Sequence, residues 1–99
     1  MMQGDSFRQP IKLTRADGTE ITADELSFIE VFIGNIRKTS PEITFENGMF
    51  YVPLSQKETF RLKGTVEIQA RIRFNGSDDV IGINLGSLDV ENSISKVVI

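Results

Sequence analysis

The stretch of residues 66–74 constrains the fold of this chain more than any other. Apolar side chains occupy every second position and polar ones fill the gaps, so that Val66, Ile68, Ala70, Ile72 and Phe74 alternate with Glu67, Gln69, Arg71 and Arg73. Alternation at period two indicates a β-strand with one buried face and one face toward solvent. Turn-forming residues follow at 75–79, and residues 80–90 run back as a second strand. The sequence therefore predicts a long β-hairpin in its C-terminal third.

A short helix is predicted directly before this hairpin. Ser55 and Glu58 have the spacing of a capping box, in which the serine hydroxyl accepts from a backbone N–H and the glutamate reaches back to the cap. Gly64 stands where a helix end favours a residue that adopts positive φ without strain. One or two helical turns do not persist alone in water, so packing must hold them.

Shorter strands are predicted in the first half of the chain. Residues 6–14 alternate around Pro10, which removes a hydrogen-bond donor and places this strand at a sheet edge or kinks it. Asn47-Gly48 is a two-residue hairpin signal between a short strand at 43–45 and a returning strand that Pro53 closes. Residues 37–41 are interpreted as a solvated connection, and residues 22–25 as either one helical turn or a plain loop.

Residues 26–34 carry apolar side chains on both faces. Ile29, Val31 and Ile33 line one face, whereas Phe28 and Phe32 flank Glu30 on the other. Such a strand is either covered on both sides or exposes an apolar stripe to a partner. Core filling is the commoner role of phenylalanine, but these two remain candidates for a contact surface.

Two further groups join Phe28 and Phe32 as candidate partner-binding residues. Arg71 and Arg73 project from the outer face of the long strand, where they either line the same surface or only provide solubility. The apolar residues Val97, Val98 and Ile99 would be an aggregation hazard if left free, so we expect them to pair in a sheet of this molecule or of a neighbour.

The whole pattern predicts an all-β fold. About seven or eight short strands with turns at near-regular spacing are typical of an antiparallel β-sandwich. No linker, repeat or low-complexity tract divides the chain, so residues 1–99 are predicted to form a single domain.

Composition and charge argue against several classes of function. Eleven basic and fourteen acidic residues give a net charge of −3 without clusters of one sign, which does not favour nucleic acid or an anionic membrane. The start of the chain lacks the pattern of a signal peptide and no membrane-spanning segment is seen, so we expect a protein that folds in the cytoplasm where it is made.

No catalytic, metal or cofactor motif is found. The chain has no histidine and no cysteine, so Ser6 and the other serines lack the usual activating base. Asp78 and Asp79 are interpreted as solvated turn acids; with Asn75 they supply too few ligands, at the wrong spacing, for calcium. The glycines are too widely spaced for a phosphate-binding loop. We therefore predict a protein that is not an enzyme and holds neither metal nor cofactor.

Two segments resemble a known family. The sequence Leu54-Ser55-Gln56-Lys57-Glu58-Thr59-Phe60-Arg61-Leu62-Lys63-Gly64, followed by the alternating strand that ends at Asn75-Gly76, is similar to the immunoglobulin-like N-terminal domain of upper baseplate proteins of tailed phages of Gram-positive bacteria. Residues 3–7 and the Asp17-Gly18 turn fit the beginning of the same domain. The resemblance implies an immunoglobulin-like sandwich in a virion component that contacts copies of itself and neighbouring tail proteins.

The functional expectation is thus a structural or assembly subunit of a phage or prophage tail or baseplate, located in the virion and homo-oligomeric. The alternative is a surface- or carbohydrate-binding adhesion module. A glycan binder of this fold usually presents exposed aromatic residues, and this chain has no tryptophan and only Tyr51 as a tyrosine.

Overall fold

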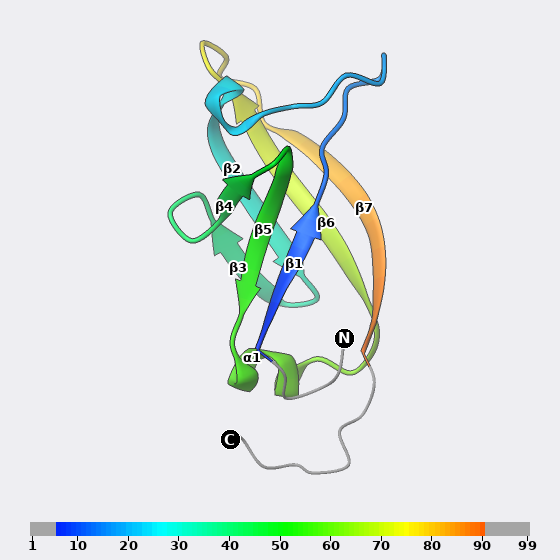
Figure 1. Ribbon diagram of the computed structural model, residues 1–99. Helices are drawn as coiled ribbons and strands as arrows, with labels where there is room; N and C mark the ends of the chain where they lie inside the picture. The colour runs from blue at the N-terminus through cyan, green and yellow to red at the C-terminus, as the bar shows by residue number, and fades with distance from the viewer. Residues whose placement is uncertain (1–5, 91–99) are drawn as a thin grey trace.

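The computed structural model describes residues 6–90, which form two antiparallel β-sheets packed face to face (Figure 1). The elements in chain order are β1 (Phe7–Ile11), the 3-10 turn η1 (Ala23–Glu25), β2 (Leu26–Ile33), β3 (Ile36–Thr39), β4 (Thr44–Glu46), β5 (Met49–Leu54), α1 (Gln56–Arg61), β6 (Gly64–Phe74) and β7 (Ile81–Val90). The predicted all-β sandwich, with a short helix before the penultimate strand, is confirmed.

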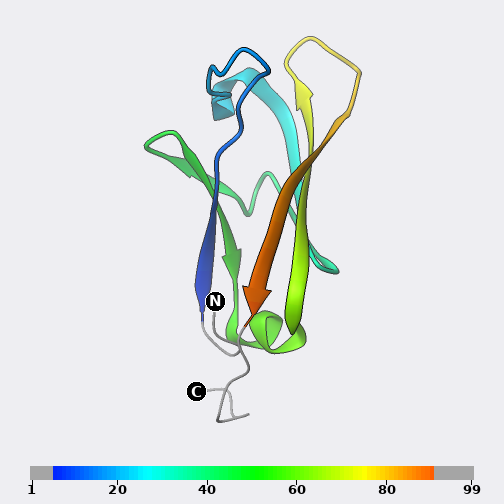
Figure 2. The same cartoon turned by 90° about the vertical axis from the view of Figure 1, so that its right-hand side faces the viewer.

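The strand order is that of an immunoglobulin-like sandwich. One sheet has the order β1-β5-β4 and the other the order β3-β2-β6-β7. These orders correspond to strands B-E-D and C′-C-F-G of immunoglobulin domains. Figure 2 shows the two sheets side by side, with β1 on one and β7 on the other facing the same open flank. Of the two alternatives predicted from Pro10, an edge strand or a kink, the structure shows the first, because β1 lies at the edge of its sheet.

The core lies between the sheets and is built from the apolar positions of the alternating strands. Along β2, Ile29, Val31 and Ile33 are buried, and they pair with Ile72, Ala70 and Ile68 of β6 in the same order. The facing sheet contributes the buried side chains Ile11, Phe50, Val52 and Leu54. Because side chains alternate between faces, burying these residues directs Phe28, Glu30 and Phe32 to the outer side of the four-stranded sheet.

The helix α1 connects the two sheets at one end of the sandwich. Ser55 Oγ accepts from the N–H of Glu58 at 3.2 Å, and Glu58 Oε1 accepts from the N–H of Ser55 at 2.9 Å, which confirms the capping box. Gly64 has φ +69°, as predicted, and Leu62 is buried. Glu58 also forms an ion pair at 2.9 Å with Lys38 of β3, so this contact links the helix to the edge strand of the four-stranded sheet.

The turns between strands follow the sequence signals closely. Asn47 and Gly48 both have positive φ, +51° and +79°, as the predicted hairpin between β4 and β5 requires. The long β6–β7 hairpin carries a bulge where Leu85 and Gly86 lie opposite Ile68. This bulge re-aims the side chains of β7 beyond it.

Two local predictions are wrong, and a third is refined. Residues 37–41 are not simply a solvated connection, because Ile36–Thr39 form the edge strand β3, whose charges face solvent or ion-pair partners. The strand β5 does not close at Pro53 but continues through Leu54, since a proline is tolerated where no ladder hydrogen bond is needed. Of the two alternatives for residues 22–25, a helical turn or a plain loop, the structure has a single 3-10 turn at Ala23–Glu25, and the preceding Thr22 makes no side-chain cap to the backbone.

Candidate functional site

The outer face of the four-stranded sheet brings four of the predicted residues together. Residues directly opposite one another in a sheet point to the same side. Phe28 lies opposite Arg73, Glu30 opposite Arg71, and Phe32 opposite Gln69 on β6 and Arg37 on β3. We call this set the outer patch; it comprises Phe28, Glu30, Phe32, Arg37, Gln69, Arg71 and Arg73. Among residues 6–90 no element packs over it (Figures 1 and 2).

Glu30 is the centre of the outer patch and is almost fully buried. Its side chain is only 7% exposed although it projects from a surface strand. Arg37 Nε pairs with Glu30 Oε2, and Arg71 Nη1 lies 3.5 Å from Glu30 Oε1. One carboxylate therefore serves two guanidinium groups, and the cluster keeps a positive charge. A carboxylate removed from water to this degree depends on such partners.

Phe28 and Phe32 flank Glu30 along β2, and both are half-buried. Each sits beside an arginine of a neighbouring strand, Arg73 and Arg37 respectively. Each of the two residues keeps part of its surface exposed. Aromatic and arginine side chains together are the residue types enriched at the centres of protein–protein interfaces.

Arg73 is fixed by a different contact. Its Nε donates to Ser27 Oγ at 3.2 Å, and Ser27 Oγ donates to the Arg73 carbonyl at 3.3 Å. The two arginines of β6 are thus both held in place, Arg71 by Glu30 and Arg73 by Ser27. Held side chains lose less conformational entropy when they bind a partner.

A hollow of about 320 Å³ opens beside Arg71 on the same face, between β6 and β7. Its floor is Gly82, which lies directly opposite Arg71, and a Cβ at Gly82 would meet no atom within 4 Å. Gln69 and Asn84 form a second opposing pair along its wall. Asn84 Oδ1 accepts from the N–H of Gly86 at 2.9 Å, which fixes the orientation of this side chain.

Sequence reasoning found part of the outer patch and missed the rest. Phe28, Phe32, Arg71 and Arg73 lie on one face as expected, whereas Val97, Val98 and Ile99 lie outside the described residues. Glu30 and Arg37 had no binding or structural role predicted from the sequence. A single acidic residue between two phenylalanines in an otherwise apolar strand was the available signal for a buried ion pair.

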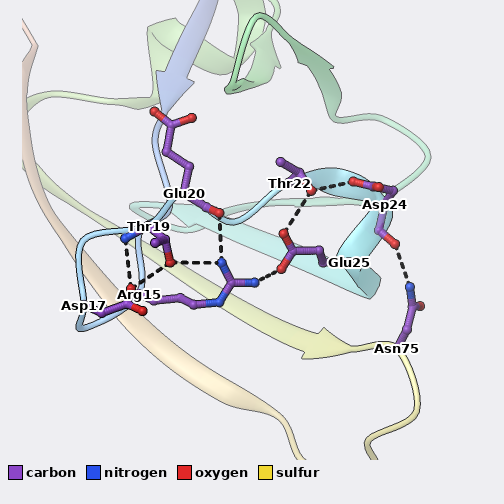
Figure 3. Close-up of polar contacts among 8 residues, drawn as sticks. All are labelled: Arg15, Asp17, Thr19, Glu20, Thr22, Asp24, Glu25 and Asn75. Carbon is purple, nitrogen blue, oxygen red and sulfur yellow. Dashed lines mark hydrogen bonds and ion pairs between the residues drawn. The ribbon is translucent and has the colours of Figure 1, made fainter.

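A second polar cluster lies at the end of the sandwich remote from α1, and Figure 3 shows it. Arg15 pairs with Glu25 and donates to Thr19 Oγ1 at 3.3 Å and to the Glu20 carbonyl at 2.9 Å. Asn75 Nδ2 donates to the Asp24 carbonyl at 2.7 Å, and the Asn75 N–H donates to the Glu25 carbonyl at 2.9 Å. These contacts join the β1–β2 connection to the β6–β7 turn, so the cluster has a structural role.

Asp17 organises the tight turn within that connection. Its carboxylate accepts from Thr19 Oγ1 at 2.7 Å and from the Thr19 N–H at 2.9 Å. These hydrogen bonds lower the pKa of Asp17 below its ordinary value of 3.8. Because the two main causes are hydrogen bonds from Thr19 within the same turn, the shift reflects turn geometry and not a reactive group.

An apolar hollow of about 340 Å³ lies between β7 and the β1–β2 connection. Ile21, Ile72, Phe74, Ile81 and Ile83 line it, together with the backbone segment 14–16. Val80 and Ile81 beside it are 47% and 44% exposed. This hollow offers few polar groups that would orient a ligand.

The residues weighed for catalysis and metal binding do not converge. Asp78 and Asp79 lie in the exposed β6–β7 turn, where the Asp79 N–H donates to Ser77 Oγ at 3.1 Å, and Ser6 is exposed at the start of the described chain. Within residues 6–90, no group of three or more acidic side chains lies close enough to hold a metal ion. The same part of the chain contains no helix of the length and hydropathy needed to cross a membrane.

No protein family model, curated protein or solved structure matches this sequence. The outer patch and its hollow therefore have to be interpreted from their own geometry and charge.

Proposed function

We propose that this domain is a non-enzymatic assembly subunit that binds another polypeptide through the outer patch. The observation that carries the proposal is the buried Glu30 carboxylate, which holds Arg37 and Arg71 on an uncovered sheet face between two partly exposed phenylalanines. A sheet face that served only for solubility would not need a buried ion pair, because exposed charges suffice.

The resemblance in residues 54–76 supports the tail or baseplate of a phage or prophage as the setting. The resemblance implies a component that is assembled by contact between copies and with neighbouring tail proteins. The proposed partners are copies of this chain and neighbouring tail proteins, and the proposed location is the virion.

The adhesion alternative is less well supported. Tyr51, the only tyrosine, lies on the outer face of the other sheet, where the Arg8 guanidinium covers its ring at 4.5 Å from the centroid. A ring stacked under a guanidinium offers little of its face to a sugar.

Self-association measured by sedimentation equilibrium over a wide concentration range tests the outer patch. We expect the wild-type chain to associate and Phe32→Glu to reduce association at least tenfold, because the added charge would have to be buried in the contact. Tyr51→Glu is the matched control, since it places the same charge on the outer face of the three-stranded sheet. A wild-type chain that stays monomeric, or equal effects of the two variants, would contradict the role of the patch in self-contact.

The setting is tested separately. After induction of the phage that encodes the chain, purified particles are probed with an antibody against the domain. We expect the chain to co-purify with tails at a fixed copy number, and its absence from the particles would contradict the assignment to the virion.

A further inference from the structure

The geometry points to a carboxylate-binding subsite within the outer patch: the hollow above Gly82 receives an acidic side chain from the partner polypeptide, and Arg71 is its main anchor. This inference rests on the proposed function and adds the chemistry of the partner. It is carried by the position of Arg71, by the space beside it and by the charge of the surrounding face.

Arg71 is positioned to bind a second carboxylate besides Glu30. Only Nη1 approaches Glu30, at 3.5 Å, and the Arg71 side chain remains 56% exposed. A guanidinium has five N–H donors, so a single long contact leaves most of them available. The Glu30 contact restrains the Arg71 side chain and leaves its other N–H donors available. A restrained guanidinium suits bidentate binding of a planar carboxylate.

The space beside Arg71 results from Gly82. Any other residue at position 82 would project its side chain from the same face, directly opposite Arg71. The backbone at Gly82 does not have a positive φ, so glycine is not required there by the conformation of the chain. Its absent side chain instead leaves the hollow open, with the amide groups of Gln69 and Asn84 beside the arginine.

The charge of this part of the face favours an anionic ligand of small size. Arg37 and Arg71 share the single carboxylate of Glu30, and Arg73, which Ser27 holds, adds a further positive charge on the same face. Farther along the face, Glu67 of β6 lies 3.5 Å from the Gln69 amide, and Asp89 of β7 is exposed. A long polyanion would run onto these acids, whereas a single carboxylate beside Arg71 would not.

The phenylalanines favour a polypeptide as the source of the carboxylate. Phe28 and Phe32 lie on β2, on the side of Arg71 away from the hollow, so a peptide that extends from the hollow across β6 reaches these partly exposed residues. A peptide with apolar side chains next to an acidic one matches both features. An acidic polysaccharide would match only the charge.

The experiment uses two synthetic octapeptides of alternating residues, Glu-Leu and its neutral counterpart Gln-Leu, titrated into the ¹⁵N-labelled chain. We expect the Glu-Leu peptide to shift the amide signals of Gly82 and Asn84 and to bind at least tenfold more tightly than Gln-Leu. Gly82→Val fills the hollow without changing any charge and should weaken binding of Glu-Leu at least tenfold. Arg71→Lys, which keeps the charge but removes the planar fork, should give an intermediate loss.

Arg61→Gln on α1 is the matched charge control and should leave binding unchanged, and thermal melts confirm that each variant is folded. Equal binding of the two peptides, no binding at all, or full binding by Gly82→Val would overturn the subsite. Tighter binding of a hexuronate oligosaccharide than of Glu-Leu would also overturn it, in favour of a glycan ligand. If the subsite fails while Phe32→Glu still abolishes self-association, the proposed function stands without it.

Discussion

The two outer faces of the sandwich use the same residue types with different results. On the three-stranded sheet, Arg8 lies over Tyr51 and pairs with Glu46 at 3.4 Å, and both charged side chains are more than half exposed. On the four-stranded sheet, the Glu30 carboxylate is buried beneath its arginines and between two phenylalanines. An ion pair in water contributes little to stability and is screened by salt. A buried carboxylate, in contrast, requires its cationic neighbours to stay in one arrangement around it. This difference is the reason for proposing the four-stranded face, and not the other, as the contact surface.

A third ion pair lies between these extremes. Lys38 and Glu58 are 13% and 17% exposed and join β3 to α1 across the end of the sandwich. The burial of the carboxylate therefore decreases from Glu30 through Glu58 to Glu46. The free energies of unfolding of matched variants should follow the same order.

The largest effect is expected when Glu30 loses both cations. In the double variant Arg37→Met, Arg71→Met, side chains of similar length still cover the carboxylate but no cation pairs with it, and we expect the free energy of unfolding to fall by about 3 kcal/mol. Chemical denaturation measures the change. Adding Glu30→Gln to the double variant should recover a part of the loss, because no charge is then left unpaired. A loss below about 0.5 kcal/mol, the range of an exposed pair, would remove the contrast between the faces.

A smaller and pH-dependent effect is expected at Glu58. Burial by itself raises the pKa of this carboxyl, but the hydrogen bond from the Ser55 N–H and the contacts with Lys38 outweigh it and hold the pKa below its ordinary value of 4.5. A depressed pKa contributes stability that is fully present above the unfolded-state value and is lost as the pH falls through the folded-state value.

Glu58→Gln should therefore cost about 1 kcal/mol near neutral pH and less as the pH falls below the ordinary carboxyl range. Parallel denaturation curves of the wild type and the variant over the acid range measure this convergence. Curves that stay parallel down to acid pH would show that the charge of Glu58 does not carry the effect.

The smallest effect is expected at the exposed pair. Arg8→Ala and Glu46→Gln should each change the free energy of unfolding by no more than about 0.5 kcal/mol, because both groups remain hydrated in the folded state. The difference between the variants and the wild type should shrink further in added salt. A loss as large as that expected at Glu30 would mean that the two faces are energetically alike.

The fold was predictable because the pattern of apolar residues repeats at period two over most of the chain. The alternation in residues 66–74, the Asn47-Gly48 hairpin and the Ser55–Glu58 capping box each determine local structure through their own chemistry, and the structure contains all three. The strand β3 was missed because Arg37 and Lys38 resemble a solvated loop when their partners are unknown.

The outer patch was predictable only in part. Phe28 and Phe32 stand out from the sequence because they share a strand with buried residues of the opposite face. The burial of Glu30 depends on Arg71 lying opposite and on Arg37 reaching across from β3, and both follow from the register between strands far apart in the sequence. The hollow at Gly82 likewise depends on the bulged register of β7 and cannot be derived from composition.

The central claim is that the outer patch meets another polypeptide and that the opposite face does not. Thiol labelling tests it directly, because the chain contains no cysteine of its own. Gln69→Cys places a thiol in the outer patch, and Thr44→Cys places one on the outer face of the three-stranded sheet. We expect association to slow maleimide labelling of Gln69→Cys at least tenfold and to leave Thr44→Cys unchanged. Equal labelling of Gln69→Cys in the free and associated chain would contradict the claim.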